Sequence, residues 1–346
     1  MTSKERVLAT MNFQPVDRPA VMPLEGTAWI CRRAGISYAD QYEMADYGAA
    51  DIVKGFEDMK SDVVFCGGSC WMAWAHAFGS EVDATTVGGP VNVGPAFDPE
   101  KGIPEMTDDE IRETLLNDYY IKAMLGQIKA VKAIVGDDKP IMSGHCGPFT
   151  GASVLAGTKK FVKYVGKNNP ILPALLDFTS RVLGIYADLM KDAGTDILNV
   201  CDPMASGDMV ALDTFKDLDL PAMETYLKYK PELPYLVHIC GNAGERVEFI
   251  RDFGAAFFSV DSMVDMADMI RKCDHKMVMV GNINPAGVML QGTPEDVYNE
   301  TKKLLEMAKE NGGGIIPSTG CELPAASPLE NILAMVKAAE DMGAIG

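Results

Sequence analysis

A histidine and two cysteines are the residues of this sequence whose types and spacing best suit metal chemistry. His238 and Cys240 stand one residue apart in the apolar run Leu-Val-His-Ile-Cys, and Cys321 follows a second apolar run, 321 − 240 = 81 residues further on. On a strand, residues i and i+2 point to the same face. An imidazole and two thiolates favour zinc, and three protein ligands leave a fourth position for a substrate. The spacing alone leaves open a second interpretation, a buried histidine with two inert cysteines.

The elements that must bring these residues together are short apolar runs, each followed by a stretch of helical length. Most of them are apolar throughout, as parallel strands buried on both faces are. Eight such units predict a (β/α)₈ TIM barrel, because the alternative, a doubly wound sheet, would carry a GxGxxG fingerprint after its first strand, and none is there. The predicted strands are Arg18–Pro23, Ser61–Cys66, Pro140–His145, Thr195–Cys201, Leu233–Cys240, Ala255–Asp261, Lys276–Gly281 and Gly314–Ser318.

The barrel accounts for the whole chain, so we expect one domain over residues 1–346 with a short N-terminal extension. The connection from Cys66 to Lys139 is long and predicts an elaboration at the barrel mouth, with a small hairpin and a helix over Asp108–Val135. Further helices are expected at Pro294–Asn311, where Thr293 can cap, and from Ser327 to about Gly343, with two more between Leu155 and Lys191.

Composition limits the partners. The 346 residues are 47% hydrophobic and 23% charged, which is typical of a globular protein, and 31 basic against 49 acidic residues give a net charge of −18. A field of this sign makes nucleic acid or an anionic membrane surface an unfavourable partner. The N-terminal residues lack the apolar core of a secretory leader, and no later run suits a membrane span, so we expect a cytoplasmic protein with reduced cysteines.

Catalytic residues of a barrel lie where the strands end, at the carboxyl face. Glu25 follows the first predicted strand, which neighbours the eighth in a closed barrel, so Glu25 is a candidate fourth zinc ligand or a general base. His145 and Cys146 end the third strand and point to opposite faces; we expect His145 to face the substrate. The remaining candidates are pocket residues, with loop capping as the alternative: Asp202 and Asn282, which we also expect to contact a cofactor, and Asp261.

Three tryptophans, Trp29, Trp71 and Trp74, fall in the first two rim loops and are candidates for stacking on an aromatic substrate or a flat macrocycle. Packing within the loops is the alternative. Four further cysteines are expected to be bystanders: Cys31, Cys66, Cys70 and Cys273.

Several motifs occur together in an order that resembles a known family. They are Asp-Pro-Met-Ala-Ser-Gly-Asp at 202–208, Leu-Val-His-Ile-Cys-Gly-Asn at 236–242, Ser-Val-Asp at 259–261, Gly-Asn-Ile-Asn-Pro at 281–285, Gly-Thr-Pro-Glu-Asp-Val at 292–297 and Ser-Thr-Gly-Cys-Glu-Leu-Pro at 318–324. Together they resemble the uroporphyrinogen decarboxylase superfamily, and within it the corrinoid methyltransferase branch. The resemblance implies that His238, Cys240 and Cys321 bind zinc. It also implies that a methyl group moves between a small methylated compound and a corrinoid.

No corrinoid-binding module accompanies the predicted barrel, so we expect a separate corrinoid protein as partner, and a homodimer is possible. Glu25 and the tryptophans favour the demethylating direction, with a methoxyaromatic or another O-, N- or S-methyl compound as donor. The reverse direction, from methylcobalamin to a thiol of the coenzyme M type, is the alternative. Two further alternatives are a catalytically idle binder of tetrapyrroles or corrinoid proteins, and the decarboxylase itself. The decarboxylase would carry an arginine-bearing motif where this chain has Pro-Leu-Glu-Gly-Thr-Ala-Trp, at 23–29.

Overall fold

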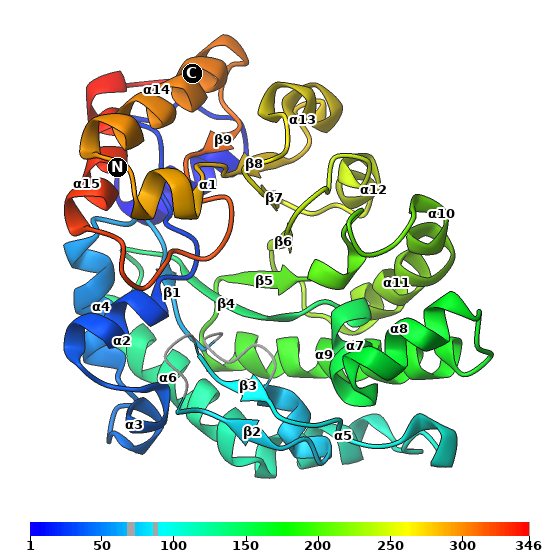
Figure 1. Cartoon of the computed structure of the whole chain (residues 1–346). Coiled ribbons are helices and arrows are strands. Elements are labelled where there is room, and N and C mark those ends of the chain that lie inside the picture. The colour runs from blue at the N-terminus through cyan, green and yellow to red at the C-terminus, as the bar shows by residue number, and fades with distance from the viewer. Residues whose placement is uncertain (68–72, 86–88, 346) are drawn as a thin grey trace.

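Seven parallel strands form one curled sheet with helices around its outside (Figure 1), in a computed structural model that describes residues 1–67, 73–85 and 89–345. The strands neighbour one another in chain order, as a TIM-barrel-like α/β fold requires. They are β1 (Val64–Phe65), β4 (Ile141–Cys146), β5 (Ile197–Cys201), β6 (Tyr235–Ile239), β7 (Phe257–Val260), β8 (Val278–Val280) and β9 (Ile315–Ile316). The barrel prediction is confirmed, and seven of the eight predicted strands overlap a strand of the sheet.

The eighth predicted strand, Arg18–Pro23, forms no strand, and this part of the prediction is wrong. Its backbone still bridges the two edges of the sheet, since Val21 O accepts from Asp62 N beside β1 at 2.9 Å and Met22 N donates to Pro317 O after β9 at 3.2 Å. Proline has no N–H to donate, so Pro19 and Pro23 prevent a regular ladder here. The segment thus occupies the eighth position of the barrel through single hydrogen bonds.

The connection after β1 matches its prediction in outline. It contains an antiparallel hairpin, β2 (Val82–Asp83) with β3 (Val91–Asn92). The helix expected over Asp108–Val135 is two helices, α5 (Asp108–Asn117) and α6 (Tyr119–Val135), because the side chain of Asp118 accepts from Ile121 N and starts a new helix. The two helices expected between Leu155 and Lys191 are α8 (Thr158–Gly166) and α9 (Leu172–Ala193), and α7 (Pro148–Ala156) precedes them.

The other helices cover the outside of the sheet and close its ends (Figure 1). In α14 (Pro294–Glu310), Thr293 forms the expected cap, and Asp296 completes a capping box. None of the helices in the described residues has the length and apolar character of a membrane span. The others are α1 (Ser3–Met11), α2 (Thr27–Ala34), α3 (Tyr38–Glu43), α4 (Ala49–Asp58), α10 (Leu212–Thr214), α11 (Leu220–Tyr229), α12 (Val247–Asp252), α13 (Met266–Cys273) and α15 (Leu329–Met342), with short turns η1 (Ala73–Phe78), η2 (Pro99–Lys101), η3 (Pro203–Ala205), η4 (Phe215–Asp219) and η5 (Pro285–Leu290).

The register of the sheet places chemically active side chains in one row near its carboxyl end. Cys146 pairs with Cys201, Cys201 pairs with His238, and His238 pairs with Ser259. Partners in register on neighbouring strands project to the same face of a sheet. Four neighbouring strands, β4 to β7, therefore contribute a thiol, a thiol, an imidazole and a hydroxyl at one level of the barrel.

Candidate metal centre

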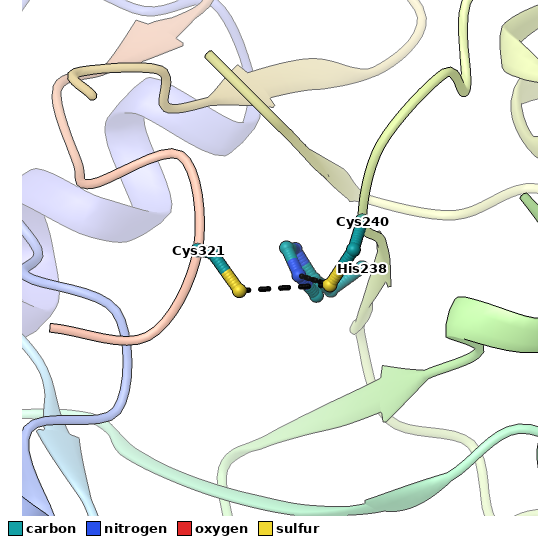
Figure 2. Close-up of side chains that lie close together, drawn as sticks. All are labelled: His238, Cys240 and Cys321. Atoms are coloured by element: carbon teal, nitrogen blue, oxygen red, sulfur yellow. Dashed lines mark hydrogen bonds between the residues drawn. The ribbon is translucent and has the colours of Figure 1, made fainter. Parts of the chain in front are cut away.

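His238, Cys240 and Cys321 meet in space, as the sequence predicted. One ligand atom from each lies within 4.8 Å of the other two. His238 Nε2 is 3.0 Å from Cys240 Sγ, and Cys240 Sγ is 3.5 Å from Cys321 Sγ. Figure 2 shows the two thiols pointing toward each other from different parts of the chain, with the imidazole between their backbones.

Two elements position these ligands. His238 belongs to β6, and Cys240 follows the end of that strand. Cys321 lies in the loop after β9, which is anchored on both sides: Ile283 N donates to Ser318 O at 3.0 Å, and Leu323 N donates to Leu24 O at 3.0 Å. Closure of the barrel thus brings residues that are 81 positions apart into contact.

The distances are close to those around a zinc ion. Tetrahedral zinc with Zn–S of about 2.3 Å and Zn–N of about 2.05 Å separates two sulfurs by about 3.8 Å and a sulfur from a nitrogen by about 3.6 Å. The observed separations of 3.5 and 3.0 Å are somewhat shorter, so a small outward movement of the side chains would admit the ion. Three protein ligands leave one coordination position, which is the arrangement of catalytic rather than structural zinc sites.

The two thiols influence each other strongly. The two thiols lie within hydrogen-bonding distance, and either sulfur can donate. With Cys240 as the donor, the hydrogen bond lowers the pKa of Cys321, with a further contribution from His238, and raises the pKa of Cys240. One sulfur of the pair is thus deprotonated more readily than an isolated thiol. Deprotonated sulfur is the form that binds metals.

Glu25 points into the barrel beside this group, but the three-residue cluster does not include it. Its carboxylate accepts from Asn199 Nδ2 at 3.4 Å and lies 3.8 Å from Cys201 Sγ. Burial, and then the charges of Glu322 and Cys321, raise the pKa of Glu25 well above its usual value. A small cavity of about 10 Å³ borders Glu25. This volume is close to the smallest that can hold one water molecule. Its role as a fourth ligand or a base stays a prediction.

His145 is turned away from the cluster. Its Nδ1 is 2.8 Å from Cys146 O and its Nε2 is 3.1 Å from Tyr226 OH in α11, so protein groups occupy both ring nitrogens. Burial lowers its pKa to about 4. The expectation that His145 and Cys146 face opposite sides agrees with this geometry, but it is Cys146 that shares a row with His238. These contacts favour a structural role for His145, and its predicted substrate contact has no support from them.

Asp202, Asp261 and Asn282 all make contacts within the protein. Asp202 is buried and accepts from Thr150 N at 2.8 Å and Phe149 N at 3.1 Å, so it caps α7. Asp261 accepts from Gly241 N at 3.0 Å. Asn282 Nδ2 donates to Asp261 O at 3.0 Å and Val264 O at 2.8 Å. The loop-capping alternative describes the contacts of Asp202 and Asn282, whereas Asp261 accepts from a residue on the neighbouring strand segment. Catalytic or cofactor-binding roles for the three residues stay predictions.

The tryptophans that lie in the described residues are packed into the structure. Trp29 is buried, donates from Nε1 to Ser327 O at 2.8 Å and carries Arg33 over its ring. Trp74 is buried and donates to Cys146 Sγ at 3.1 Å. Trp71, like Cys70, lies outside the described residues. The expected bystanders Cys31, Cys66 and Cys273 are free and buried.

Three residues near the cluster were given no role from the sequence: Cys201, which ends a predicted strand, Ser259 and Glu322. The strand register would have indicated the first two, since they pair directly with His238. Glu322 follows Cys321 in an irregular loop, where no periodicity points to an orientation. Its carboxyl group is largely buried, and burial raises its pKa to about 7.

The family model for uroporphyrinogen decarboxylase (URO-D) matches residues 2–342. The chain belongs to the uroporphyrinogen decarboxylase family. It is 29% identical to the methylcobamide:CoM methyltransferase MtbA of Methanosarcina acetivorans, over 98% of both chains. A solved methyltransferase from Methanosarcina mazei superposes with a TM-score of 0.87 at 26% identity, covering 99% of both chains. Similarity to the uroporphyrinogen decarboxylase of Synechocystis sp., at 25% identity, spans 68% of this chain and 63% of that protein.

Proposed function

We propose that this protein is a corrinoid-dependent methyltransferase that moves a methyl group between the corrinoid of a partner protein and a small compound. The observation that carries the proposal is the convergence of His238, Cys240 and Cys321 within 4.8 Å at the carboxyl end of the barrel. The similarity to methyltransferases over nearly the whole chain supports it, and similarity to the decarboxylase of Synechocystis sp. covers about two thirds of the chain. In this proposal the three residues hold zinc.

When bound, zinc supplies Lewis acidity, which lowers the pKa of a thiol at the open position or polarises a heteroatom that carries a methyl group. The chain's own part is to hold the ligands rigidly and to shield them from water. His238 is buried and the two thiols are partly buried. A largely enclosed site strengthens the interaction between the ligands and the developing charge of the reacting group.

We place methyl transfer to a small thiol first. The relative from Methanosarcina acetivorans, which aligns over 98% of both chains, is named a methylcobamide:CoM methyltransferase. We therefore propose a thiol of the coenzyme M type as the acceptor class. In this direction the thiol proton must be lost before sulfur attacks the methyl group, because the thiolate is the nucleophile.

Demethylation of an O-, N- or S-methyl compound, including a methoxyaromatic one, is the second candidate. Glu25 favours it, since burial raises the pKa of this carboxyl group well above its usual value and so favours its protonated form. A protonated carboxyl can donate to a basic leaving oxygen, which is general acid catalysis.

Two assays separate these directions. One supplies methylcobalamin with a panel of small thiols and follows loss of the methyl–cobalt bond by absorbance; the other supplies Co(I) cobalamin with a panel of methoxyaromatic compounds. We expect about one zinc per chain and turnover in the thiol assay, with both lost in Cys321→Ser and retained in Cys273→Ala, whose thiol is buried on α13. Turnover confined to the second assay would reverse the direction, and full activity of a metal-free wild type would refute the zinc site.

The remaining alternatives have their own outcomes in the same preparation. Decarboxylation of uroporphyrinogen by a zinc-free protein would favour the decarboxylase. Zinc binding with neither reaction would favour a catalytically idle binder of a tetrapyrrole or a corrinoid protein. A homodimer and a cytoplasmic location stay predictions, which size-exclusion chromatography with light scattering and cell fractionation would test.

A further inference from the structure

Strand β7 presents a second pair of polar side chains opposite the ligand pair of β6. In the register of the two strands, His238 pairs with Ser259 and Ile239 pairs with Val260. Asp261 directly follows β7, and Cys240 directly follows β6. The Ser-Val-Asp segment thus runs beside the His-Ile-Cys segment of the neighbouring strand.

Ser259 contacts the imidazole on the side away from the cysteines. Its Oγ is 3.0 Å from His238 Nδ1, while His238 Nε2 faces Cys240 Sγ. Both His238 and Ser259 are buried. If Nε2 offers a lone pair to a metal, Nδ1 of the neutral ring carries the proton. Nδ1 then donates a hydrogen bond to Ser259 Oγ. The hydrogen bond therefore fixes both the tautomer and the orientation of the ring.

Asp261 acts on the other ligand through the backbone. Its Oδ2 accepts from Gly241 N at 3.0 Å, directly after Cys240. From the opposite side, Asp208 Oδ2 accepts from Asn242 N at 2.9 Å. The turn is close-fitting, because Gly241 has φ +69° and a Cβ there would lie 2.2 Å from Asp208 Oδ2. The carboxylates of Asp261 and Asp208 thus fix the backbone of the turn at Gly241 and Asn242, which sets the direction of the Cys240 side chain.

Asp261 is itself held in place. Its Oδ1 accepts from Ser262 Oγ at 3.1 Å, and its backbone carbonyl accepts from Asn282 Nδ2 at 3.0 Å. Asp261 is thus held through its backbone to the segment after β8 and through its carboxylate to its own loop, so its second carboxylate oxygen has a fixed position beside Gly241. This arrangement differs from simple capping, because the hydrogen bond crosses from one strand to the residue beside a ligand on another.

We propose that Ser259 and Asp261 are positioning residues for the metal centre, Ser259 through the ring of His238 and Asp261 through the backbone beside Cys240. This inference rests on the proposed zinc site. It assigns to β7 the task of preorganising two of the three ligands, while Cys321 arrives from the loop after β9. Partners of this kind typically change metal affinity by about 10–100-fold when they are removed.

The test compares metal binding in two pairs of variants of the full chain. Ser259→Ala is matched by Ser143→Ala, a buried strand serine whose Oγ accepts from Thr195 at 2.9 Å on β4. Asp261→Ala is matched by Asp265→Ala, which removes a carboxylate that accepts from Ala267 N at the start of α13. Asp261→Asn keeps an oxygen acceptor at the same place and should recover most of the loss. Melting of the metal-free proteins shows that each variant folds.

Two readouts are used, neither of which depends on turnover. Zinc affinity is measured by competition with a chromogenic chelator, and Co²⁺ is substituted to report the coordination geometry by its absorption bands, since zinc itself is spectroscopically silent. We expect Ser259→Ala and Asp261→Ala to bind zinc about 10–100-fold more weakly than wild type and to shift the cobalt bands. The two control variants should match wild type in both readouts.

The outcomes are distinguishable. Zinc affinities within twofold of wild type, with unchanged cobalt spectra, would overturn the positioning role. A wild type that binds no zinc would overturn this inference and the proposed zinc site together. A third outcome is that the two variants lose zinc affinity while the wild type transfers no methyl group. That outcome would support the positioning role and contradict only the proposed reaction.

Discussion

Replacement of Cys321 by serine tests whether the convergent group binds metal. The substitution removes one of three protein ligands and leaves Cys240 Sγ without the thiol that now lies 3.5 Å away. Zinc sites with four protein ligands have apparent binding free energies of about 10–16 kcal/mol, or about 2.5–4 kcal/mol per ligand. Loss of one ligand should therefore weaken zinc binding by about 10²–10³-fold.

The weaker binding can be read as lost thermal stabilisation. Free zinc at about 1,000 times the wild-type Kd should stabilise the fold by about 4 kcal/mol, and the same concentration should stabilise Cys321→Ser by about 0.4–1.4 kcal/mol. An unfolding entropy of about 2.1 cal/mol/K per residue over 346 residues converts these values into shifts of about 6 °C and about 1–2 °C.

The assay is a melting curve with and without zinc for both proteins, with zinc content measured after dialysis. Cys273→Ala is the control, because this cysteine is buried on α13 against Met279 Sδ and should leave the zinc-dependent shift intact. Equal zinc-dependent shifts in wild type and Cys321→Ser would refute the ligand assignment. If Cys273→Ala also lost the zinc-dependent shift in melting temperature, the loss would reflect general destabilisation and not the removal of a zinc ligand.

Three further predictions concern residues outside the cluster. Burial lowers the pKa of His145 to about 4, below the unfolded value of about 6.5, so the folded state binds fewer protons. Stability should fall by up to about 3 kcal/mol as the pH drops from 6.5 to 4. His145→Gln should show a smaller loss in urea titrations over this range, and equal pH slopes would contradict the reasoning. Asp62→Ala should lower stability by about 3–5 kcal/mol in chemical denaturation, since Asp62 is buried and pairs with Arg6 and Arg18 at 2.7 and 2.8 Å; a change below about 1 kcal/mol would contradict it. Trp29→Phe should cost about 1–3 kcal/mol by leaving Ser327 O unpaired, while the KM for the methyl substrate stays constant, and a large rise in KM would restore the stacking role.

The His-x-Cys pair was predictable because a strand has a fixed period of two, which places both side chains on one face whatever the rest of the fold does. The same period could not orient His145. Every residue of β4 is buried, so the pattern of apolar residues does not tell the two faces of the strand apart. Whether His145 points into the barrel or toward the helix layer therefore depends on its neighbours in the fold. In the structure that choice is made by Tyr226, which offers a hydroxyl on the helix side.

Asp202 illustrates a different limit. It directly follows β5, where barrel enzymes place catalytic groups, but the N-terminus of α7 lies against it and its free N–H groups use the carboxylate. The two segments are about 50 residues apart, and nothing local in the sequence predicts their contact. The missing first strand has a simpler cause, since two prolines in six residues remove the donors that a ladder needs.

The net charge of −18 describes the surface of this protein more than its site. Glu322, Asp202 and Glu25 lie in or near the barrel mouth, and burial raises the pKa of each: to about 7 for Glu322, to about 6 for Asp202, and well above the usual value for Glu25. Glu322 and Glu25 are therefore protonated more readily than surface carboxyl groups, which weakens the charge repulsion between a polyanionic substrate and the mouth. A bound dication would reverse the direction for groups beside it, because a nearby positive charge favours the ionised form. The electrostatic exclusion of a polycarboxylate substrate is thus a weaker argument than the missing arginine-bearing motif, and the convergence of His238, Cys240 and Cys321 carries the choice of reaction.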